Sequence, residues 1–385
     1  MKTAGIICEY NPFHLGHARQ FRLIRERLGA DTKIVCVMSG NYVQRGMPAK
    51  WDKFIRAEAA LRCGADLVLE LPITGVLQSA EGFARTGVEI LSRLGCVDYL
   101  CFGAECGNEA SLMEMASYMD SPSFQQELKD GMATGLPYAA ARQTALRDKD
   151  QLLSKPNNIL GLEYCRAILQ LSASLQPMAV LRNGDYHDQN ADQAEPSATS
   201  VRSLYPNGNW QHFVPDAVSA LLDQMPWYDI AYGERAFLAR LRGLSDKEWQ
   251  NCAHGSEGLW SKAMKAARTK SDYLSVAEAI KSKRYPMTRI HRLLLCAYLG
   301  ISDAALKQPI PYVRILASNT AGRELLRDAK NRDDLVLINA GQTPKDNAYY
   351  RMECRCADLY TLFAAPGFQT ACQLEQNNRI FLSNR

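Results

Sequence analysis

The sequence has little that is typical of a membrane or secreted protein. No stretch of its 385 residues approaches the ~20 consecutive apolar residues that a membrane-spanning helix requires. Its start lacks the long apolar segment and the small-residue cleavage site of a secretory signal, and its short apolar run already carries Glu9. Hydrophobic residues make up 47% of the chain and charged residues 22%, as in ordinary globular domains. We therefore expect a folded cytoplasmic protein with no membrane association.

The twelve cysteines lack the paired spacing of a zinc site. Cys96, Cys101 and Cys106 follow a C-x4-C-x4-C pattern, and Cys354 and Cys356 form a C-x-C pair. Structural zinc sites use paired C-x2-C or matching His spacings instead. In a long chain without a secretory signal, such cysteines are better interpreted as reduced thiols, many of them in the core. We predict no metal cluster.

Neither sign of charge dominates, because 45 Lys and Arg residues and 41 Asp and Glu residues leave a net charge of +4. So small an excess does not by itself indicate a nucleic-acid partner. Basic residues do cluster at residues 262–270 and 281–292. In the second cluster, an apolar helical stripe is expected to leave Arg289 and Arg292 facing outward beside Tyr285. That face would either meet unpaired RNA bases or be ordinary solvated surface.

The first hundred residues alternate apolar strand-like runs with amphipathic helical stretches, which predicts an α/β fold with a Rossmann-like, doubly wound parallel sheet. We expect a strand order of 3-2-1-4, with a ligand site at the carboxyl ends of the strands. The predicted strands are residues 3–8, 33–38, 66–71 and 97–102, and the predicted helices between them are residues 17–28, 52–63 and 79–94.

A domain boundary is predicted near residue 210, after the turn-forming residues 205–209. The first domain would therefore span residues 1–210 and the second residues 211–385. Beyond the boundary the pattern is mainly α-helical, with one possible late strand at residues 335–339. The predicted helices there are residues 215–225, 233–241, 246–251, 256–267, 275–282 and 287–299.

The turn after the first strand carries the strongest functional signal. Asn11 and Pro12 end the strand, and Gly16 precedes a helix whose free backbone amides favour an anion. His14 and His17 would then donate hydrogen bonds to phosphate oxygens. An isolated H-x-G-H pattern is weak, since a lone His is more often structural. Its position in a strand–turn–helix favours the phosphate role.

Rival phosphate motifs are absent. The sequence contains no G-x-x-x-x-G-K-[ST] motif, and no G-x-G-x-x-G follows a strand, which argues against a P-loop kinase and a dinucleotide-dependent oxidoreductase. A turn of the H-x-G-H form is used by nucleotidyltransferases and class I aminoacyl-tRNA synthetases for attack at the α-phosphate of ATP. A second phosphate element is suggested at residues 197–202, where Ser200 and Arg202 match an I-S-S-T-x-x-R loop. A Ser helix cap with a solvated Arg is an equal alternative.

Eight stretches of the chain together resemble the tRNA(Met) cytidine acetate ligase family and span nearly the whole sequence. They are residues 5–17, 38–46, 64–72, 102–105, 156–164, 186–188, 286–290 and 311–314. The chain departs from the family pattern at Met47, where an acidic residue is usual, and in the short turn at residues 183–186.

The resemblance implies a reaction and its partners. Acetate would attack the α-phosphate of ATP to give acetyl-adenylate and diphosphate. The exocyclic N4 amine of the wobble cytidine of elongator tRNA(Met) would then take the acetyl group, leaving N4-acetylcytidine and AMP. Mg²⁺ would arrive with ATP and be held mostly by the phosphates. Residues 1–210 would be the nucleotidyltransferase-like catalytic domain, and residues 211–385 would bind tRNA.

The resemblance also implies the site residues. His14 and His17 would be catalytic. Outside the first turn, ATP would contact Gly103, Arg182 and one Asn of the 157–158 pair, with Asn157 favoured; Ser200 and Arg202 come from the possible second phosphate element. The ATP-binding turn itself would comprise Ile7, Cys8, Glu9, Tyr10, Asn11, Pro12, Phe13, His14, Leu15, Gly16, His17, Ala18, Arg19 and Gln20.

Five polar residues have two interpretations each. Gln44 and Arg45 would either face the transferred group or belong to an ordinary polar loop. Lys50, Lys53 and Arg56 recur at helical spacing, so they would either meet phosphate or tRNA or form a solvated helix face.

Two other functions compete with the ligase. A small-molecule adenylyltransferase of cofactor metabolism would not need the basic helical second half. A non-catalytic RNA-binding protein would not need His14 or His17.

Overall fold

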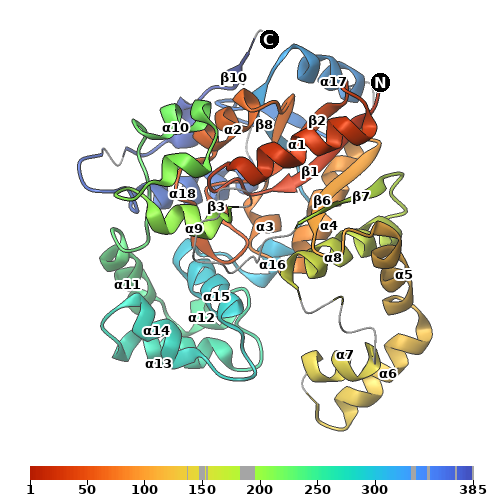
Figure 1. Ribbon diagram of the computed structural model, residues 1–385. Coiled ribbons are helices and arrows are strands. Elements are labelled where there is room, and N and C mark those ends of the chain that lie inside the picture. The colour runs from red at the N-terminus through yellow and green to blue at the C-terminus, as the bar shows by residue number, and fades with distance from the viewer. Residues whose placement is uncertain are drawn as a thin grey trace.

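The computed structural model describes residues 1–136, 138–146, 152, 155–182, 196–330, 335–344, 347–368 and 371–383. A mostly parallel sheet with helices on both faces forms the centre, and helices extend from it in two groups (Figure 1). The strands are β1 (Thr3–Cys8), β2 (Lys33–Ser39), β3 (Tyr42–Val43), β4 (Met47–Pro48), β5 (Leu67–Leu71), β6 (Tyr99–Ala104), β7 (Gln176–Leu181), β8 (Val313–Ser318), β9 (Leu337–Asn339) and β10 (Phe381–Leu382).

The helices cover both halves of the chain. They are α1 (Leu15–Leu28), α2 (Lys53–Arg62), α3 (Ile73–Val76), α4 (Ala80–Leu94), α5 (Glu109–Met119), α6 (Pro122–Ala133), α7 (Tyr138–Leu146), α8 (Pro156–Gln170), α9 (Ala198–Leu204), the 3₁₀ helix η2 (Trp210–Phe213), α10 (Asp216–Leu222), α11 (Glu234–Gly243), α12 (Asp246–Asn251), α13 (Leu259–Thr269), α14 (Tyr273–Ile280), α15 (Met287–Leu299), α16 (Asp303–Leu306), α17 (Thr320–Lys330), α18 (Ala348–Thr361) and α19 (Leu374–Asn377). None of the described helices is long and apolar enough to cross a membrane.

The main sheet has the strand order β10-β8-β5-β2-β1-β6-β7, and β9 pairs with β8. The segment β5-β2-β1-β6 confirms the predicted order of 3-2-1-4, and β1, β2, β5, β6 and β7 are all parallel. Every residue of β1 is buried, as expected of a parallel strand covered on both faces. This arrangement brings the turns that follow β1, β6 and β7 to one edge of the sheet.

Two apolar clusters occupy the two faces of the sheet. Along β1, Ile6 joins the cluster that contains Phe21 and Ile24 of α1, whereas Ile7 joins the cluster that contains Val88 of α4 and Leu162 of α8. Successive strand side chains point to opposite faces, so one uninterrupted apolar run supplies both clusters. The first helix is therefore anchored by its packing, and its N-terminal turn is held at the sheet edge.

The second half of the chain contributes both helices and strands. Helices α10 to α15 lie where helical periodicity predicted them, and α11 to α15 gather at the lower left of Figure 1. The late strand predicted at residues 335–339 is present as β9. Strand β8 was not predicted, and it pairs antiparallel with β5, so the sheet draws strands from both sides of residue 210.

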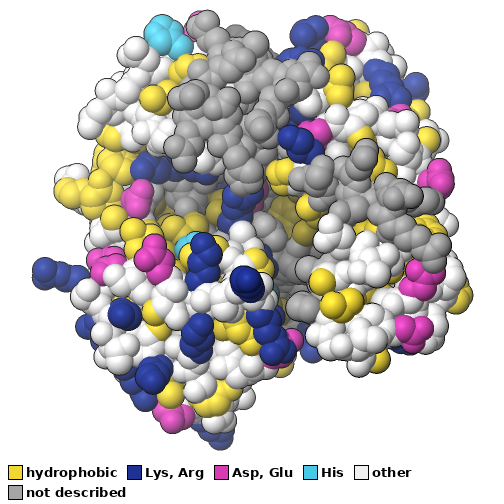
Figure 2. Space-filling view, turned by 60° about the horizontal axis from the view of Figure 1, so that its bottom comes forward, with side chains coloured by type: hydrophobic (Ala, Val, Ile, Leu, Met, Phe, Trp, Pro, Cys, Tyr) yellow, Lys and Arg dark blue, Asp and Glu magenta, His cyan; other side chains and the backbone are white. Residues whose placement is uncertain are grey.

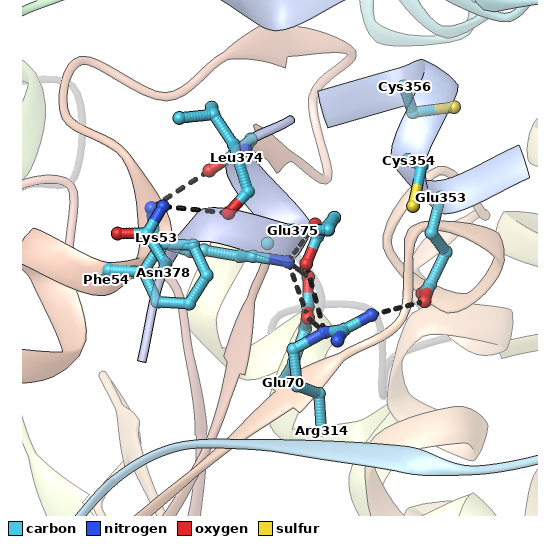
Figure 3. Close-up of polar contacts among 12 residues, drawn as sticks. Lys53, Phe54, Glu70, Arg314, Glu353, Cys354, Cys356, Leu374, Glu375 and Asn378 are labelled. Carbon is cyan, nitrogen blue, oxygen red and sulfur yellow. Dashed lines mark hydrogen bonds and ion pairs between the residues drawn. The ribbon is translucent and has the colours of Figure 1, made fainter. Parts of the chain in front are cut away.

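A buried ion cluster joins β8 to the first half of the molecule (Figure 3). Arg314 of β8 lies 3.1 Å from Glu70 of β5, 3.1 Å from Glu375 of α19 and 3.3 Å from Glu353 of α18. The Lys53 ammonium of α2 completes the cluster through Glu70, at 2.6 Å, and Glu375. The cluster explains why Arg314 is tolerated in the middle of an apolar strand.

Both interpretations of the basic residues on and before α2 are wrong, because all three side chains are buried. Lys53 belongs to the ion cluster. Arg56 donates to the carbonyls of Trp51, at 2.9 Å, and Ser39, at 3.1 Å. Lys50 lies 4.0 Å from the ring centroid of Trp227. These cations hold the sheet-edge loops together and do not form a solvated or RNA-facing surface.

Candidate functional site

A pocket of about 550 Å³ opens at the carboxyl ends of β1, β6 and β7. Its walls come from the turn between β1 and α1, the loop between β3 and β4, the start of α8, the residues just after β7, the start of α9, and α15. The face in Figure 2 is hollowed near its middle, with Lys and Arg side chains around the hollow. The pocket thus lies where a doubly wound sheet normally binds its ligand.

The turn after β1 is organised by its two histidines. His14 is the N-cap of α1, and its Nδ1 accepts the Gly16 backbone N–H at 3.1 Å. His17 Nδ1 in turn accepts the His14 backbone N–H at 3.2 Å, and the two rings stack with centroids 3.7 Å apart. A Cβ atom on Gly16 would lie 2.9 Å from the His14 ring, so this position requires glycine for close approach. The spacing H-x-G-H therefore encodes a reciprocal helix cap made of two imidazoles.

This capping fixes where each imidazole can donate. A neutral ring whose Nδ1 accepts a hydrogen bond carries its proton on Nε2, so the network assigns an Nε2–H to both rings. Burial, followed by the charges of Arg182 and Arg202, lowers the pKa of His14 to about 3. Burial also lowers the pKa of His17 well below its usual value. Both rings line the pocket as neutral donors at physiological pH.

Two arginines lie on the same side of the pocket as the histidines. Arg202 of α9 donates to the Asn11 carbonyl at 2.6 Å and to Thr199 Oγ1 at 3.1 Å, which ties α9 to the turn. Arg182 follows β7, and a Cβ atom on Gly103 would lie 2.6 Å from its Cδ. Glycine at position 103 therefore makes room for the Arg182 side chain against the end of β6.

Of the two interpretations of residues 197–202, the helix cap is correct for Ser200, whereas Arg202 is not a solvated side chain. Ser200 is fully buried, and its backbone N–H and side chain form a capping box with Ser197. Among the described residues that line the pocket, Arg202 is present and Ser200 is not. The element at residues 197–202 thus presents a cation to the pocket while its buried serine stabilises the helix start.

The Asn pair is divided between the pocket and the core. Asn157 lines the pocket, and its Nδ2 donates to Glu105 Oε1 at 2.7 Å. Asn158 is buried, and its Oδ1 accepts the Cys106 backbone N–H at 3.0 Å. Glu105 also accepts the Asn158 backbone N–H at 2.9 Å, so it caps the start of α8.

Most of the predicted turn residues line the pocket, and the others support them from behind. Phe13 is fully buried, with its ring centroid 4.9 Å from that of Tyr10 and 5.4 Å from that of Phe21. The predicted residues that line the pocket are Ile7, Cys8, Glu9, Tyr10, Asn11, His14, Gly16, His17, Arg19, Gln20, Gly103, Asn157, Arg182 and Arg202. The predicted residues that do not line it, as far as the structure describes them, are Pro12, Phe13, Leu15, Ala18 and Ser200. The family-like residues 183–188 lie outside the described residues.

A second wall of the pocket agrees with one of the two interpretations of Gln44 and Arg45, but the part that α15 contributes was not predicted. Gln44 and Arg45 line the pocket, as do Thr288 and Arg292 of α15. The prediction that Arg292 faces outward is wrong, since only 7% of this residue is exposed and its Nη1 donates to the Gln44 carbonyl at 3.3 Å. Helical periodicity placed Arg292 off the apolar stripe, and the contact with the distant β3–β4 loop, which helps to bury it, could not be predicted from that periodicity.

The loop between β3 and β4 contacts α15 closely. A Cβ atom on Gly46 would lie 2.4 Å from the Arg292 backbone nitrogen, so glycine at position 46 permits this contact. Gln44 is held from two other directions, because its N–H donates to Glu9 Oε1 at 2.7 Å and its Nε2 to the Gln78 carbonyl at 3.1 Å. The second wall is therefore joined to the first turn through Glu9.

Metal ligands are not gathered in this part of the molecule. No group of three or more His, Cys, Asp or Glu side chains is placed to hold a metal ion in the part of the chain that the structure describes. Every cysteine there is a free thiol. The described lining of the pocket offers neutral imidazoles and guanidinium groups.

Comparisons with known proteins agree over nearly the whole chain. The model of the family described as HIGH Nucleotidyl Transferase matches residues 1–376. The tRNA(Met) cytidine acetate ligase of Acetivibrio thermocellus is 34% identical, over 99% of this chain and 100% of that protein. The ligase of the same name from Clostridium novyi is also 34% identical, over 88% of this chain and 89% of that protein.

Solved structures agree as well. The apo form I of Thermotoga maritima TmcAL matches with a TM-score of 0.90 at 27% sequence identity. Form II of the same protein, bound with alpha-thio ATP, matches with a TM-score of 0.87 at 26% identity. Each match covers 100% of both chains.

Proposed function

This chain belongs to the tRNA(Met) cytidine acetate ligase family of HIGH nucleotidyl transferases, and we propose that its pocket uses ATP to activate acetate for transfer to elongator tRNA(Met). The observation that carries the proposal is the pair of capped, neutral imidazoles of His14 and His17 at the sheet edge. Their two Nε2–H donors, with Arg182 and Arg202, suit the triphosphate of ATP.

The first step is attack on ATP. One carboxylate oxygen of acetate forms a bond to the α-phosphorus, and the bond to the bridging oxygen breaks, so that diphosphate leaves with the electron pair. His14 and His17 stabilise charge on the phosphates by donating hydrogen bonds from rings whose lowered pKa keeps them neutral in the ligand-free pocket. Gly103, Asn157 and the residues of the β1–α1 turn position the nucleotide.

The second step is acyl transfer. The N4 amine of the wobble cytidine attacks the carbonyl carbon of acetyl-adenylate, a C–N bond forms, and AMP leaves as the C–O bond breaks. The amine loses one proton, and the product is N4-acetylcytidine. We assign tRNA binding to residues 211–385, where exposed basic residues such as Lys281 and Lys283 lie between α14 and α15. Because its substrate is a tRNA, we place the protein in the cytoplasm.

Magnesium enters this proposal with ATP. Mg²⁺ prefers phosphate oxygens and retains several waters, so it needs few protein ligands. Glu9 is the acidic side chain among the described pocket-lining residues, but its Oε1 accepts the Gln44 N–H. We therefore expect the ion to be held mainly by the β- and γ-phosphates.

Mass spectrometry of the RNA product tests the proposal directly. The full-length protein is incubated with elongator tRNA(Met), ATP and isotopically labelled acetate, and the digested tRNA is searched for labelled N4-acetylcytidine. We expect the label at the wobble position, with AMP released in equal amount. Omission of ATP, and a tRNA whose wobble base is not cytidine, are the matched controls. Formation of adenylate without any labelled tRNA would contradict the acceptor, and AMP formation that ignores acetate would contradict the acid.

A further inference from the structure

The buried guanidinium of Arg292 has no carboxylate counter-ion among the residues that the structure describes. Its Nη1 donates to the Gln44 carbonyl at 3.3 Å, but its Nε is buried with no hydrogen-bond partner in the described structure. No Asp or Glu of the described chain forms an ion pair with it. The neighbouring ionisable groups are Arg289, His291, His254 and Cys296, and burial raises the pKa of the Cys296 thiol, so it stays uncharged. The nearby carboxylates have other partners, since Asp303 accepts the His254 backbone N–H at 3.2 Å and Glu257 pairs with Arg289 at 3.8 Å.

Such a cation is costly to bury unless an anion reaches it. Leaving a charge in a low-dielectric site without a partner costs several kcal/mol, and the burial of Arg292 lowers its pKa to about 10. Arg292 lies on the wall of the 550 Å³ pocket, beside Thr288 one turn earlier on the same helix. A negatively charged ligand in the pocket would supply the missing partner.

The position of Arg292 separates it from the phosphate-binding groups. His14 and His17 belong to the β1–α1 turn and Arg202 belongs to α9. Arg292 belongs to α15, and its guanidinium contacts the β3–β4 loop at the Gln44 carbonyl. The lining of the pocket also includes the apolar residues Val43, which directly precedes the β3–β4 loop, and Phe83 of α4. A forked cation beside apolar surface suits a small carboxylate with an alkyl group better than a polyphosphate.

We propose that Arg292 binds the carboxylate of acetate and orients it for attack on the α-phosphorus of ATP. One carboxylate oxygen stays on the guanidinium while the other forms the new bond to phosphorus. The Gln44 carbonyl holds the guanidinium in place, and Gln44 is held by Glu9, which directly follows β1. This role rests on the proposed ligase function, and it makes Arg292 the residue that selects acetate as the acid substrate of the ligase.

The role predicts a selective defect in Arg292→Gln. Removing one partner of a buried charge pair costs 2–5 kcal/mol, so we expect the KM for acetate to rise roughly 30-fold or more. The affinity for ATP should change less than about threefold, because the phosphate-binding groups are untouched. Acetate-dependent exchange of labelled diphosphate into ATP measures the first quantity, and binding of a non-hydrolysable ATP analogue measures the second. Arg292→Lys keeps the charge without the fork, and it should recover part of the loss.

Chemically synthesised acetyl-adenylate sharpens the test, because its acyl group no longer carries a carboxylate charge. Arg292→Gln should transfer acetyl from this compound to tRNA at nearly the wild-type rate. Failure of the variant with acetyl-adenylate would overturn the proposal and indicate a tRNA contact. A loss of ATP affinity with an unchanged acetate KM would overturn it in favour of a phosphate contact.

Arg166→Gln is the control for loss of a buried arginine. Arg166 pairs with Glu163 at 2.8 Å and with Asp120 at 2.9 Å, away from the pocket wall. We expect this variant to lose stability and to keep its KM for acetate, so destabilisation alone cannot mimic the Arg292 effect. The same exchange assay on the wild type separates failure of the proposed ligase function from failure of the proposed role of Arg292. Absence of acetate-dependent exchange in the wild type would reject the ligase function itself. An unchanged acetate KM in Arg292→Gln, with an active wild type, would reject only the role of Arg292.

Discussion

Arg314 and Arg292 are both buried arginines from the second half of the chain, and both contact the first half. Arg314 on β8 meets the carboxylates of Glu70, Glu353 and Glu375, whereas Arg292 on α15 meets one backbone carbonyl and the pocket. The first cation is balanced by the fold itself, so its role is structural. The second has no carboxylate partner among the described residues, and we propose that a ligand balances it. The counter-ion of a buried cation, more than its burial, therefore indicates what the cation is for.

The largest effect is expected where the balanced cation is removed. Arg314→Gln leaves three carboxylates with Lys53 as their remaining cation, and breaking such a buried pair costs about 3–5 kcal/mol of the free energy of unfolding. Urea denaturation followed by circular dichroism measures this loss. The comparison between the two arginines breaks if Arg292→Gln destabilises the ligand-free protein as much as Arg314→Gln does.

The next effect concerns the uncharged donors of the pocket. His14→Ala removes both an Nε2–H donor and the N-cap of α1, so acetate-dependent diphosphate exchange should fall roughly 10²–10³-fold. His17→Ala should fall in the same range, since it removes the other half of the reciprocal cap. His212→Ala, on the exposed side of η2, is the matched control and should retain full exchange activity. A loss below tenfold in both pocket variants would mean that the imidazoles serve only the helix start.

The pH dependence of the unfolding free energy distinguishes the ion cluster around Arg314 from the pocket. Burial and the neighbouring Glu70 raise the pKa of Glu353 to about 7, so the folded protein holds a proton that the unfolded chain releases at lower pH. This stabilisation is fully present below the unfolded pKa of about 4.5 and is lost as the pH rises through 7, at up to about 1.4 kcal/mol per pH unit. Glu353→Gln cannot lose that proton, so its unfolding free energy relative to the wild type should increase between pH 5 and 8.

His14 changes stability in the opposite direction. Its lowered pKa means that the unfolded chain binds a proton first, so the wild type loses stability as the pH falls from about 6.5 towards 3. Because the two effects overlap, the Glu353 effect has to be measured as a difference between variant and wild type at each pH. A difference that stays constant from pH 5 to 8 would contradict the raised pKa of Glu353.

The smallest change in unfolding free energy is expected for an ion pair on the surface, where the cation is neither buried nor in contact with the pocket. Arg22 and Glu26 form an exposed ion pair at 2.6 Å on α1, one helical turn apart. Glu26→Gln should change the unfolding free energy by no more than about 0.5 kcal/mol and leave acetate KM unchanged. A larger change would show that counter-ions matter on the surface of this protein as much as in its interior.

The sequence was most informative where local pattern and function coincide. The strand order around β1, the position of the H-x-G-H turn between β1 and α1, and the family were all predicted correctly, because each follows from short local patterns that can be recognised one at a time along the chain. The site roles of His14, His17, Gly103 and Asn157 stay predictions, now with a pocket that brings these residues together.

The misses share a physical cause. Lys53 and Arg292 were each interpreted from their own helix, where a charged residue normally faces solvent, and strand β8 with its Arg314 was not predicted at all. Each is buried by partners between 17 and more than 300 positions away, as the contacts of Lys53 with Glu70 and Glu375 illustrate. A single sequence does not show such pairings. The spacing of Arg292 two positions after Ile290 gave no helical reason for burial, and the β3–β4 loop supplies that reason.

Strand β8 has a consequence for how the protein is made. Synthesis of β5 is complete at Leu71, but β8, which pairs with the outer edge of β5, is complete only at Ser318. At 5–20 residues per second, the chain waits roughly 12–50 seconds with that edge unpaired and with Glu70 lacking Arg314. A nascent chain stopped before residue 313 would therefore expose a template for aggregation, and a chaperone that covers strand edges should bind it until translation finishes.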